Sequence, residues 1–264
     1  MTDQHRAGPN WPFWVVIATV TAAYLGLLLG MLAATSVHSA PRDLWRALGS
    51  REIQYATALS LVTCTVTALL SLAVALPVGY LMSRGRFRGK NLVDTLLDIP
   101  IVLPPMVIGL CLLVLFQTPV CRVIERFVPF TYTVYGVVLA QFIVGAAFAV
   151  RQMRTTFDHL PTRPEDVAMT LGCSRGRAVW LVTLPAAKRG MFSAASVAWA
   201  RSLGEFGPIL VFAGATRMKT EVLPTTVWLE LSVGNLEAAI AVSLMMVALA
   251  VVVLVAMRVA WERP

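Results

Sequence analysis

Long apolar stretches, free of Asp, Glu, Lys and Arg, follow one another along the chain. They cover 7–41, 53–83, 99–121, 127–150 and 238–257, and a further stretch, 191–216, is interrupted only by Arg201 and Glu205. A helix rises 1.5 Å per residue, so about 20 apolar residues cross the hydrocarbon layer of a membrane. The pattern predicts an all-α polytopic membrane protein, one transmembrane domain over 1–264, with helices at about 12–36, 55–83, 92–117, 134–156, 190–214 and 234–258.

Composition agrees with this fold class. Of the 264 residues 58% are hydrophobic and 14% are charged, against roughly 25% charged in an average soluble domain. This excludes a soluble globular enzyme and a disordered protein. A cleaved signal peptide is the alternative for the first stretch, but its apolar segment is too long and its basic start, His5 and Arg6, is thin.

The basic residues predict the orientation. With both termini on the cytoplasmic side, 14 Lys and Arg residues lie in cytoplasmic segments and 7 outside, and Arg201 lies within the membrane. Basic residues favour the cytoplasmic side of a membrane. We therefore expect a bacterial inner-membrane protein with both ends cytoplasmic. The net charge of +8 is then mostly a topology signal, and we expect contact with membrane lipid but not with nucleic acid.

The one long connection, 157–189, lies on the cytoplasmic side in this topology. Thr162 and Glu165 have the spacing of a capping box at a helix start, and Gly172 suits the residue after a helix end. Ser174 can cap a second helix, which Pro185 is expected to stop. The sequence predicts a protruding pair of short helices, either a solvated loop or a docking element that needs a partner groove.

Prolines interrupt the third apolar stretch at Pro100, Pro104 and Pro105. Each removes a backbone donor and disfavours helix in the residue before it. Freed backbone groups at membrane depth are tolerated only within protein or along a cavity. Two interpretations stay open: a broken helix that faces a pathway, or a kink near the cytoplasmic start.

Arg201 and Glu205 are four residues apart, so they would share one face of the fifth helix with opposite charges. Pairing is the usual remedy for the high free energy of a charge inside a membrane. The pair either fixes helix packing or contacts the substrate along its route. Gly204 and Gly207 flank the glutamate and would allow helices to approach closely.

Catalytic and metal-binding signatures are absent from the sequence. There is no phosphate-binding loop, no H-E-x-x-H and no G-x-S-x-G motif, and the three histidines are scattered. The four cysteines form neither a C-x-x-C pair nor a cluster with metal spacing. We therefore expect no catalytic residue, no metal and no cofactor, and an ATP site, if one is used, on another chain.

Asp166-Val-Ala-Met-Thr-Leu-Gly172, followed by Val182-Thr-Leu-Pro185, resembles the cytoplasmic signature of ABC importer permeases. That signature reads E-A-A, three residues, G, nine residues, I, one residue, L-P. Asp166 stands at the Glu position, and Val167 and Val182 replace Ala and Ile. The resemblance implies a type I permease fold and a coupling helix that docks on a separate ATPase, through Glu165, Asp166, Ala168, Gly172, Leu184 and Pro185.

Further stretches are similar to the permeases for molybdate, tungstate and sulfate. These are Asp98-Ile-Pro-Ile-Val-Leu-Pro-Pro105 and Arg201-Ser-Leu-Gly-Glu-Phe-Gly207. The resemblance implies import of a tetrahedral oxyanion. Molybdate is favoured because those permeases are homodimers, whereas sulfate permeases are pairs of related chains.

The implied partners are two ATPase subunits, an extracytoplasmic binding protein and a second permease copy. The expected pathway runs past Pro104, Pro105, Arg201, Gly204 and Glu205. Alternatives are a sulfate or thiosulfate permease, a permease of the same fold for an amino acid, phosphate or ferric ion, and a membrane-embedded enzyme, for which the expected spans hold almost no polar residues.

Overall fold

The computed structural model describes residues 11–37, 45–46 and 48–262, and these form helices joined by turns, with no strand. The helices are α1 (Trp11–Val37), α3 (Arg51–Arg84), α4 (Lys90–Val102), α5 (Pro105–Phe116), α6 (Pro119–Phe127), α7 (Val134–His159), α8 (Arg163–Thr170), α9 (Arg175–Ala178), the π-helix η1 (Val179–Thr183), α10 (Leu184–Leu203), α11 (Gly207–Phe212), α12 (Leu223–Ser232) and α13 (Leu236–Glu262). The predicted all-α fold class is confirmed.

Four of the described helices, α1, α3, α7 and α13, are long and apolar enough to cross a membrane. They correspond to the first, second, fourth and sixth predicted spans. The bent pair α4 and α5 can form one more span. Helix α10 covers much of the fifth predicted span but carries Arg201 and ends early. The count of six spans stays a prediction.

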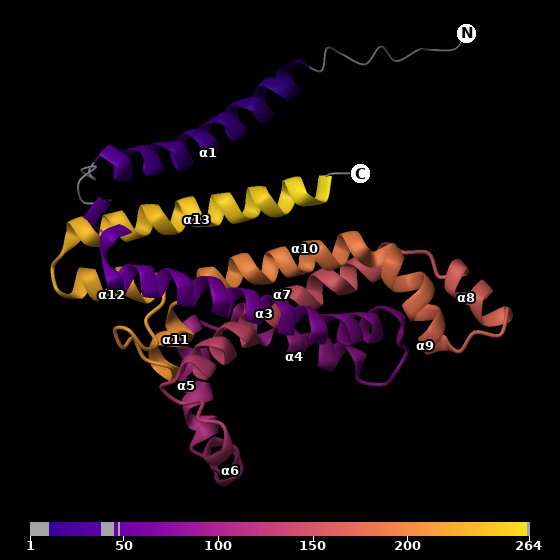
Figure 1. The fold of residues 1–264 in the computed structure, drawn as a ribbon. Helices are drawn as coiled ribbons and strands as arrows, with labels where there is room; N and C mark the ends of the chain where they lie inside the picture. The colour runs from indigo at the N-terminus through magenta and orange to yellow at the C-terminus, as the bar shows by residue number, and fades with distance from the viewer. Residues whose placement is uncertain (1–10, 38–44, 47, 263–264) are drawn as a thin grey trace.

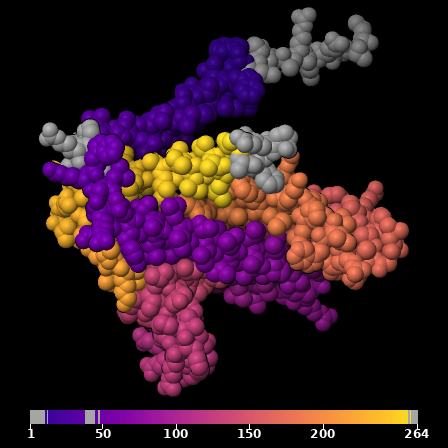
Figure 2. Space-filling model, in the orientation of Figure 1, coloured from indigo at the N-terminus to yellow at the C-terminus, as the bar shows by residue number. Residues whose placement is uncertain are grey.

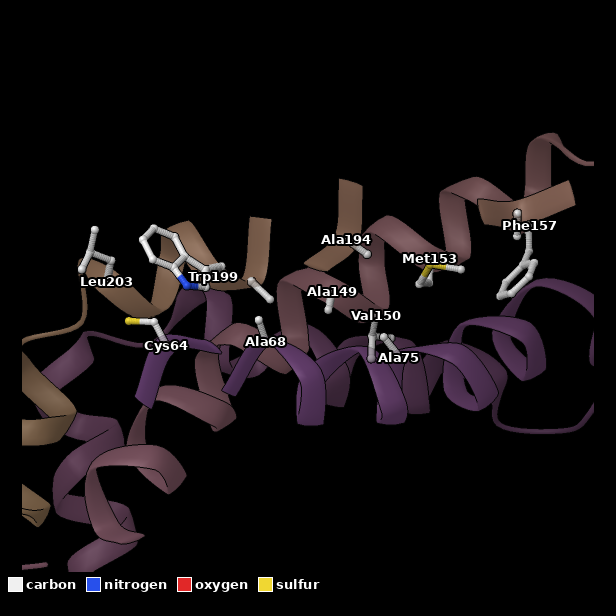
Figure 3. Close-up of a cluster of buried hydrophobic side chains, with 12 residues drawn as sticks. Cys64, Ala68, Ala75, Ala149, Val150, Met153, Phe157, Ala194, Trp199 and Leu203 are labelled. Atoms are coloured by element: carbon white, nitrogen blue, oxygen red, sulfur yellow. The ribbon is translucent and has the colours of Figure 1, made fainter. Parts of the chain in front are cut away.

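The centre of the bundle is the contact of α3 with α7 and α10. Its buried side chains are mostly small, among them Ala68 and Ala75 of α3, Ala149 of α7 and Ala194 of α10, which lie between the helices in Figure 3. Small residues let backbones approach closely, which is how helices pack in a membrane. A Cβ on Gly79 would lie 3.0 Å from the backbone nitrogen of Arg154, so α3 and α7 cross almost backbone to backbone.

Helices α1 and α13 lie on one side of this centre. Helix α1 has no buried residue in its described part and runs along the outside of the molecule, and α6 projects from the opposite side (Figure 2). Helix α1 begins, and α13 ends, at the end of the bundle where α8 and α9 protrude (Figure 1). The side of the membrane on which the termini lie stays a prediction.

The predicted pair of short helices in this connection is present as α8 and α9. Gly172 has φ +90° directly after the C-cap of α8, and the Ser174 side chain accepts from the Arg177 amide at 3.4 Å. Both sequence assignments are confirmed. The left-handed conformation at Gly172 favours glycine because a Cβ would be strained there.

The capping-box assignment is wrong. Thr162 precedes α8, but its side chain makes no capping hydrogen bond, because its backbone is already helical. The Glu165 side chain does not fold back over the helix start. It points inward and accepts hydrogen bonds from Tyr80 and Thr183.

Pro185 does not stop the second helix, contrary to expectation. The chain continues from α9 through η1 into α10 without a break. The π-turn is the reason, because its wider hydrogen bond runs from the Leu184 amide to the Val179 carbonyl. A proline in the first turn of α10 then costs little, since the first turn of a helix needs no donor from that residue.

Candidate transport site at the junction of two broken helices

The third predicted span is broken rather than kinked. Helix α4 ends at Val102, α5 begins at Pro105, and the two axes differ in direction by 111°. Pro104 caps α5, and its carbonyl accepts from the Val107 amide at 2.9 Å. Pro104 and Pro105 are both exposed on the described surface. Of the two interpretations left open, the broken helix describes the structure.

The fifth span is broken as well, and here the prediction was wrong in detail. Helix α10 ends at Leu203 with Gly204 as its C-cap, and α11 begins at Gly207 with Pro208 in its first turn. Glu205 therefore lies in the break and not on the helix face that carries Arg201. Proline is favoured in the first turn of a helix and disfavoured in the interior, so Pro208 begins α11 instead of continuing α10.

The two breaks meet. A Cβ on Gly207 would lie 2.9 Å from the Met106 backbone nitrogen and 3.0 Å from the Pro105 Cβ. A Cβ on Gly109 would lie 2.9 Å from the Pro208 Cα. Backbone thus packs on backbone where α5 crosses α11, at the residues that interrupt both spans. The sequence placed the expected pathway at these two interruptions, and the structure brings them into contact.

We expect Gly207→Ala to loosen this junction, because the added methyl overlaps the backbone at Met106. Overpacking of this kind costs about 1–3 kcal/mol. Gly204→Ala is the matched control three residues away, since its Cβ would meet only the Arg201 carbonyl, at 3.8 Å. The measurement is the unfolding temperature of the purified protein in detergent. An equal decrease for both variants would contradict the close contact.

Arg201 and Glu205 form an ion pair despite the helix end. Arg201 Nη1 lies 2.7 Å from Glu205 Oε1, and the Glu205 side chain is 1% exposed whereas that of Arg201 is 32% exposed. The Arg201 guanidinium also lies over the Phe148 ring of α7, 5.7 Å from its centroid. Cation–π contact and ion pairing together hold the arginine. The pair connects the end of α10 to the break. Of its two side chains, the positively charged Arg201 is the one that stays partly exposed.

The sequence analysis missed Gln141 of α7, which supports the end of α10. Its Nε2 donates to the Ser202 carbonyl at 3.2 Å, and its Oε1 accepts from Thr67 Oγ1 of α3 at 3.2 Å. Carbonyls in the last turn of a helix have no partner within that helix. Gln141 gives the Ser202 carbonyl a further donor beside the Glu205 amide, which bonds it at 3.2 Å, and joins three helices. A buried amide in an apolar stretch was the signal that could have revealed it.

Ion pairs that the sequence analysis also missed hold α4 against α7. Arg151 pairs with Asp98 at 2.7 Å, and Arg154 pairs with Asp94 and, at 3.8 Å, with Asp158. Asp94 and Asp98 are four residues apart on α4 and the arginines three apart on α7, so each set shares a helix face, whereas Asp158 pairs with Arg154 within α7. These partly exposed pairs lie beside the first half of the broken third span.

The predicted coupling residues differ in how far they are exposed. Asp166, Gly172 and Pro185 are exposed, and Ala168 and Leu184 are half-buried. Glu165 is buried. Large apolar side chains are exposed in the same connection: Val167 and Leu171 at α8, and Trp180 and Leu181 on η1. An exposed apolar patch on a capped helix pair is typical of an interaction surface.

At the opposite end of the bundle a charged cluster ties the 213–222 loop to its neighbours. Arg217 pairs with Glu52 of α3 and, at 2.6 Å, with Glu230 of α12. Nearby, burial raises the pKa of the Glu221 carboxyl above its usual value. A cavity of about 310 Å³ opens between these elements. Among the described residues no group of His, Cys, Asp and Glu has the arrangement of a metal site.

The structure is thus a helical bundle in which two interrupted spans meet and from which a helix pair protrudes at one end. Residues 75–260 match the family of binding-protein-dependent transport system inner membrane components. The chain belongs to this family and is a multi-pass membrane protein.

Relatives of known name agree with this assignment. A probable molybdenum ABC transporter permease protein of Haloferax volcanii is 34% identical over 237 residues, which are 90% of this chain and 85% of the relative. The molybdate/tungstate transport system permease protein WtpB of Pyrococcus abyssi is 39% identical over 154 residues, 58% of each chain.

A solved structure shares the fold. A chain from a bacterial alginate ABC transporter, crystallised with an alginate pentasaccharide-bound periplasmic protein, superposes with a TM-score of 0.75 at 13% identity. The superposition covers 96% of this chain and 95% of that one. At this identity the similarity concerns the fold alone. The type I permease fold expected from the sequence is confirmed.

Proposed function

We propose that the chain is the permease subunit of an ATP-driven importer for a tetrahedral oxyanion, with molybdate or tungstate as the substrate. The observation that carries the proposal is the similarity to the Haloferax protein over almost the whole chain. The WtpB relative supports tungstate as a second substrate of the same site. Both relatives favour molybdate and tungstate over sulfate as the substrate.

The junction of the two broken helices supports an anion pathway. An anion in an apolar environment needs hydrogen-bond donors or a positive charge, and helix N-termini provide both. Helix α5 starts at the junction, and Met106 carries its first N–H group, because Pro104 and Pro105 have none and the Val107 amide bonds the Pro104 carbonyl. Arg201 adds a positive charge in the middle of the apolar stretches, on the accessible side of its pair with Glu205.

The helix pair α8 and α9 supports a separate ATPase subunit. On this pair Val167 is 56% exposed and Leu171, the C-cap residue of α8, is 81% exposed. An apolar surface of this kind at the water-facing end of a membrane protein needs a partner. We propose that one ATPase binds each α8–α9 pair and that this end is cytoplasmic, with both termini. ATP is then hydrolysed on the partner and not on this chain.

A binding protein and a second permease copy complete the proposed importer. The family description itself names dependence on a binding protein. The charged cluster around Arg217, at the far end from α8, is where such a protein would dock. Two copies of the chain would enclose the pathway between them, and the rocking of the two copies would alternate access between the two sides.

The proposal is tested by transport. The permease, its cognate ATPase and its binding protein are reconstituted in liposomes, and ATP-dependent uptake of molybdate is measured with tungstate or sulfate as competitor. We expect uptake that tungstate suppresses at equal concentration and sulfate does not. Equal suppression by sulfate would favour the sulfate permease. If the complex takes up a different ligand and takes up neither molybdate nor tungstate, the oxyanion assignment is refuted.

A further inference from the structure

Helix α8 is attached to the rest of the protein in an unusual way. Glu165 is its one buried residue, at 6% exposure, while the apolar Val167 is 56% exposed. An amphipathic helix ordinarily packs through an apolar face. Helix α8 instead leaves Val167 exposed and Ala168 and Met169 half-buried, and its one fully buried contact with the membrane helices is made by an acid.

Each oxygen of the Glu165 carboxylate accepts a hydrogen bond from one hydroxyl group. Tyr80 Oη donates to Oε1, and Thr183 Oγ1 donates to Oε2 at 3.0 Å. A buried carboxylate requires such donors, and hydrogen bonds to a charged group are about twice as strong as those between neutral groups. The two bonds therefore fix the position of α8 more firmly than its size suggests.

The two donors belong to different helices. Tyr80 lies near the end of α3, and its ring packs edge-on against the fully buried Phe157 of α7, with centroids 5.7 Å apart. Thr183 is the last residue of η1, the π-turn that leads directly into α10. Helix α10 runs from there to Gly204, at the junction of the broken helices. Glu165 thus connects α8 to two of the three helices at the centre of the bundle.

We propose that Glu165 is a positioning residue that transmits the displacement of α8 to α3 and, through Thr183, to α10 and the junction. The inference rests on the proposed function, in which an ATPase moves α8. Docking and transmission then belong to different side chains: the exposed residues of α8 and α9 bind the ATPase, and Glu165 passes the movement on. A π-turn is a suitable point for this contact because such turns within helices occur frequently at functional sites.

The test separates transmission from docking. In liposomes with the cognate ATPase and binding protein, Glu165→Ala should leave the amount of ATPase that co-purifies unchanged. It should lower oxyanion uptake per ATP hydrolysed about tenfold, since one strong hydrogen bond shifts a conformational equilibrium by about that factor. Glu165→Gln keeps one acceptor and should recover much of the ratio. Tyr80→Phe and Thr183→Val should each lower it by a smaller factor.

Matched controls remove the same groups elsewhere. Tyr135→Phe deletes a hydroxyl from an exposed tyrosine of α7, and Thr155→Val deletes a hydroxyl that bonds only within α7. Both should keep the wild-type ratio. An unchanged ratio in Glu165→Ala would overturn the proposal, and so would a decrease that only follows a loss of bound ATPase.

The stimulation of ATP hydrolysis by loaded binding protein is measured in the same preparations, and it should be weaker in Glu165→Ala. This readout does not require molybdate to be the substrate. A wild-type complex that takes up no oxyanion would refute the proposed function. The response of its ATPase to the binding protein, compared with that of Glu165→Ala, would still decide the role of Glu165.

Discussion

Arg201→Ala should strongly lower the yield of assembled permease. The substitution leaves Glu205, which is 1% exposed, as a buried carboxylate without a counter-charge. Removing one partner of a buried ion pair costs about 3–5 kcal/mol, a large part of the 5–15 kcal/mol by which proteins are typically stable. We expect the double variant Arg201→Ala/Glu205→Ala to recover most of the assembled protein, because it removes the unpaired charge together with its partner.

The measurement is the yield and unfolding temperature of the assembled protein after extraction in detergent. Arg151→Ala is the control: its ion pair with Asp98 has nearly the same separation, 2.7 Å, but both side chains are exposed. An exposed pair contributes about 0–1 kcal/mol, so this variant should behave as the wild type does. A double variant as damaged as Arg201→Ala alone would show that the pair does not hold the end of α10.

The fold follows from the sequence because the membrane restricts the alternatives. Apolar stretches such as 53–83 and 127–150 must form helices in a lipid environment, and the structure has α3 and α7 there. The interruption of the third span was visible for the same reason, since Pro104 and Pro105 cannot continue a helix. The break in the fifth span was not predicted. The contact of these prolines with Gly207 was not visible, because it depends on how two distant segments cross.

Local rules failed where tertiary contacts were stronger. The spacing of Thr162 and Glu165 predicted a capping box, but the carboxylate gains two hydroxyl donors by turning inward. Pro185 predicted a helix end, but the π-turn before it removes the need for its missing donor. Neither the partner hydroxyls nor the π-turn can be recognised from nearby residues, so the sequence alone could not place Glu165 inside the protein.

Gly204→Cys tests the central claim, that the oxyanion passes the junction of the two broken helices. Gly204 is exposed, has an ordinary backbone conformation and has space for a Cβ. The variant is made in a background without the four native cysteines, where Leu27→Cys on α1 serves as the control. Leu27 is 70% exposed but lies on a peripheral apolar helix that we expect to face lipid.

Both variants, reconstituted with ATPase and binding protein, are treated with a negatively charged, membrane-impermeant thiol reagent with and without ATP. The pathway predicts that the cysteine at 204 is modified, that the rate changes with nucleotide, and that molybdate delivered by the binding protein slows it, while the cysteine at 27 stays unmodified. A cysteine at 204 that is as unreactive as the one at 27 in every nucleotide state would contradict a pathway at this junction.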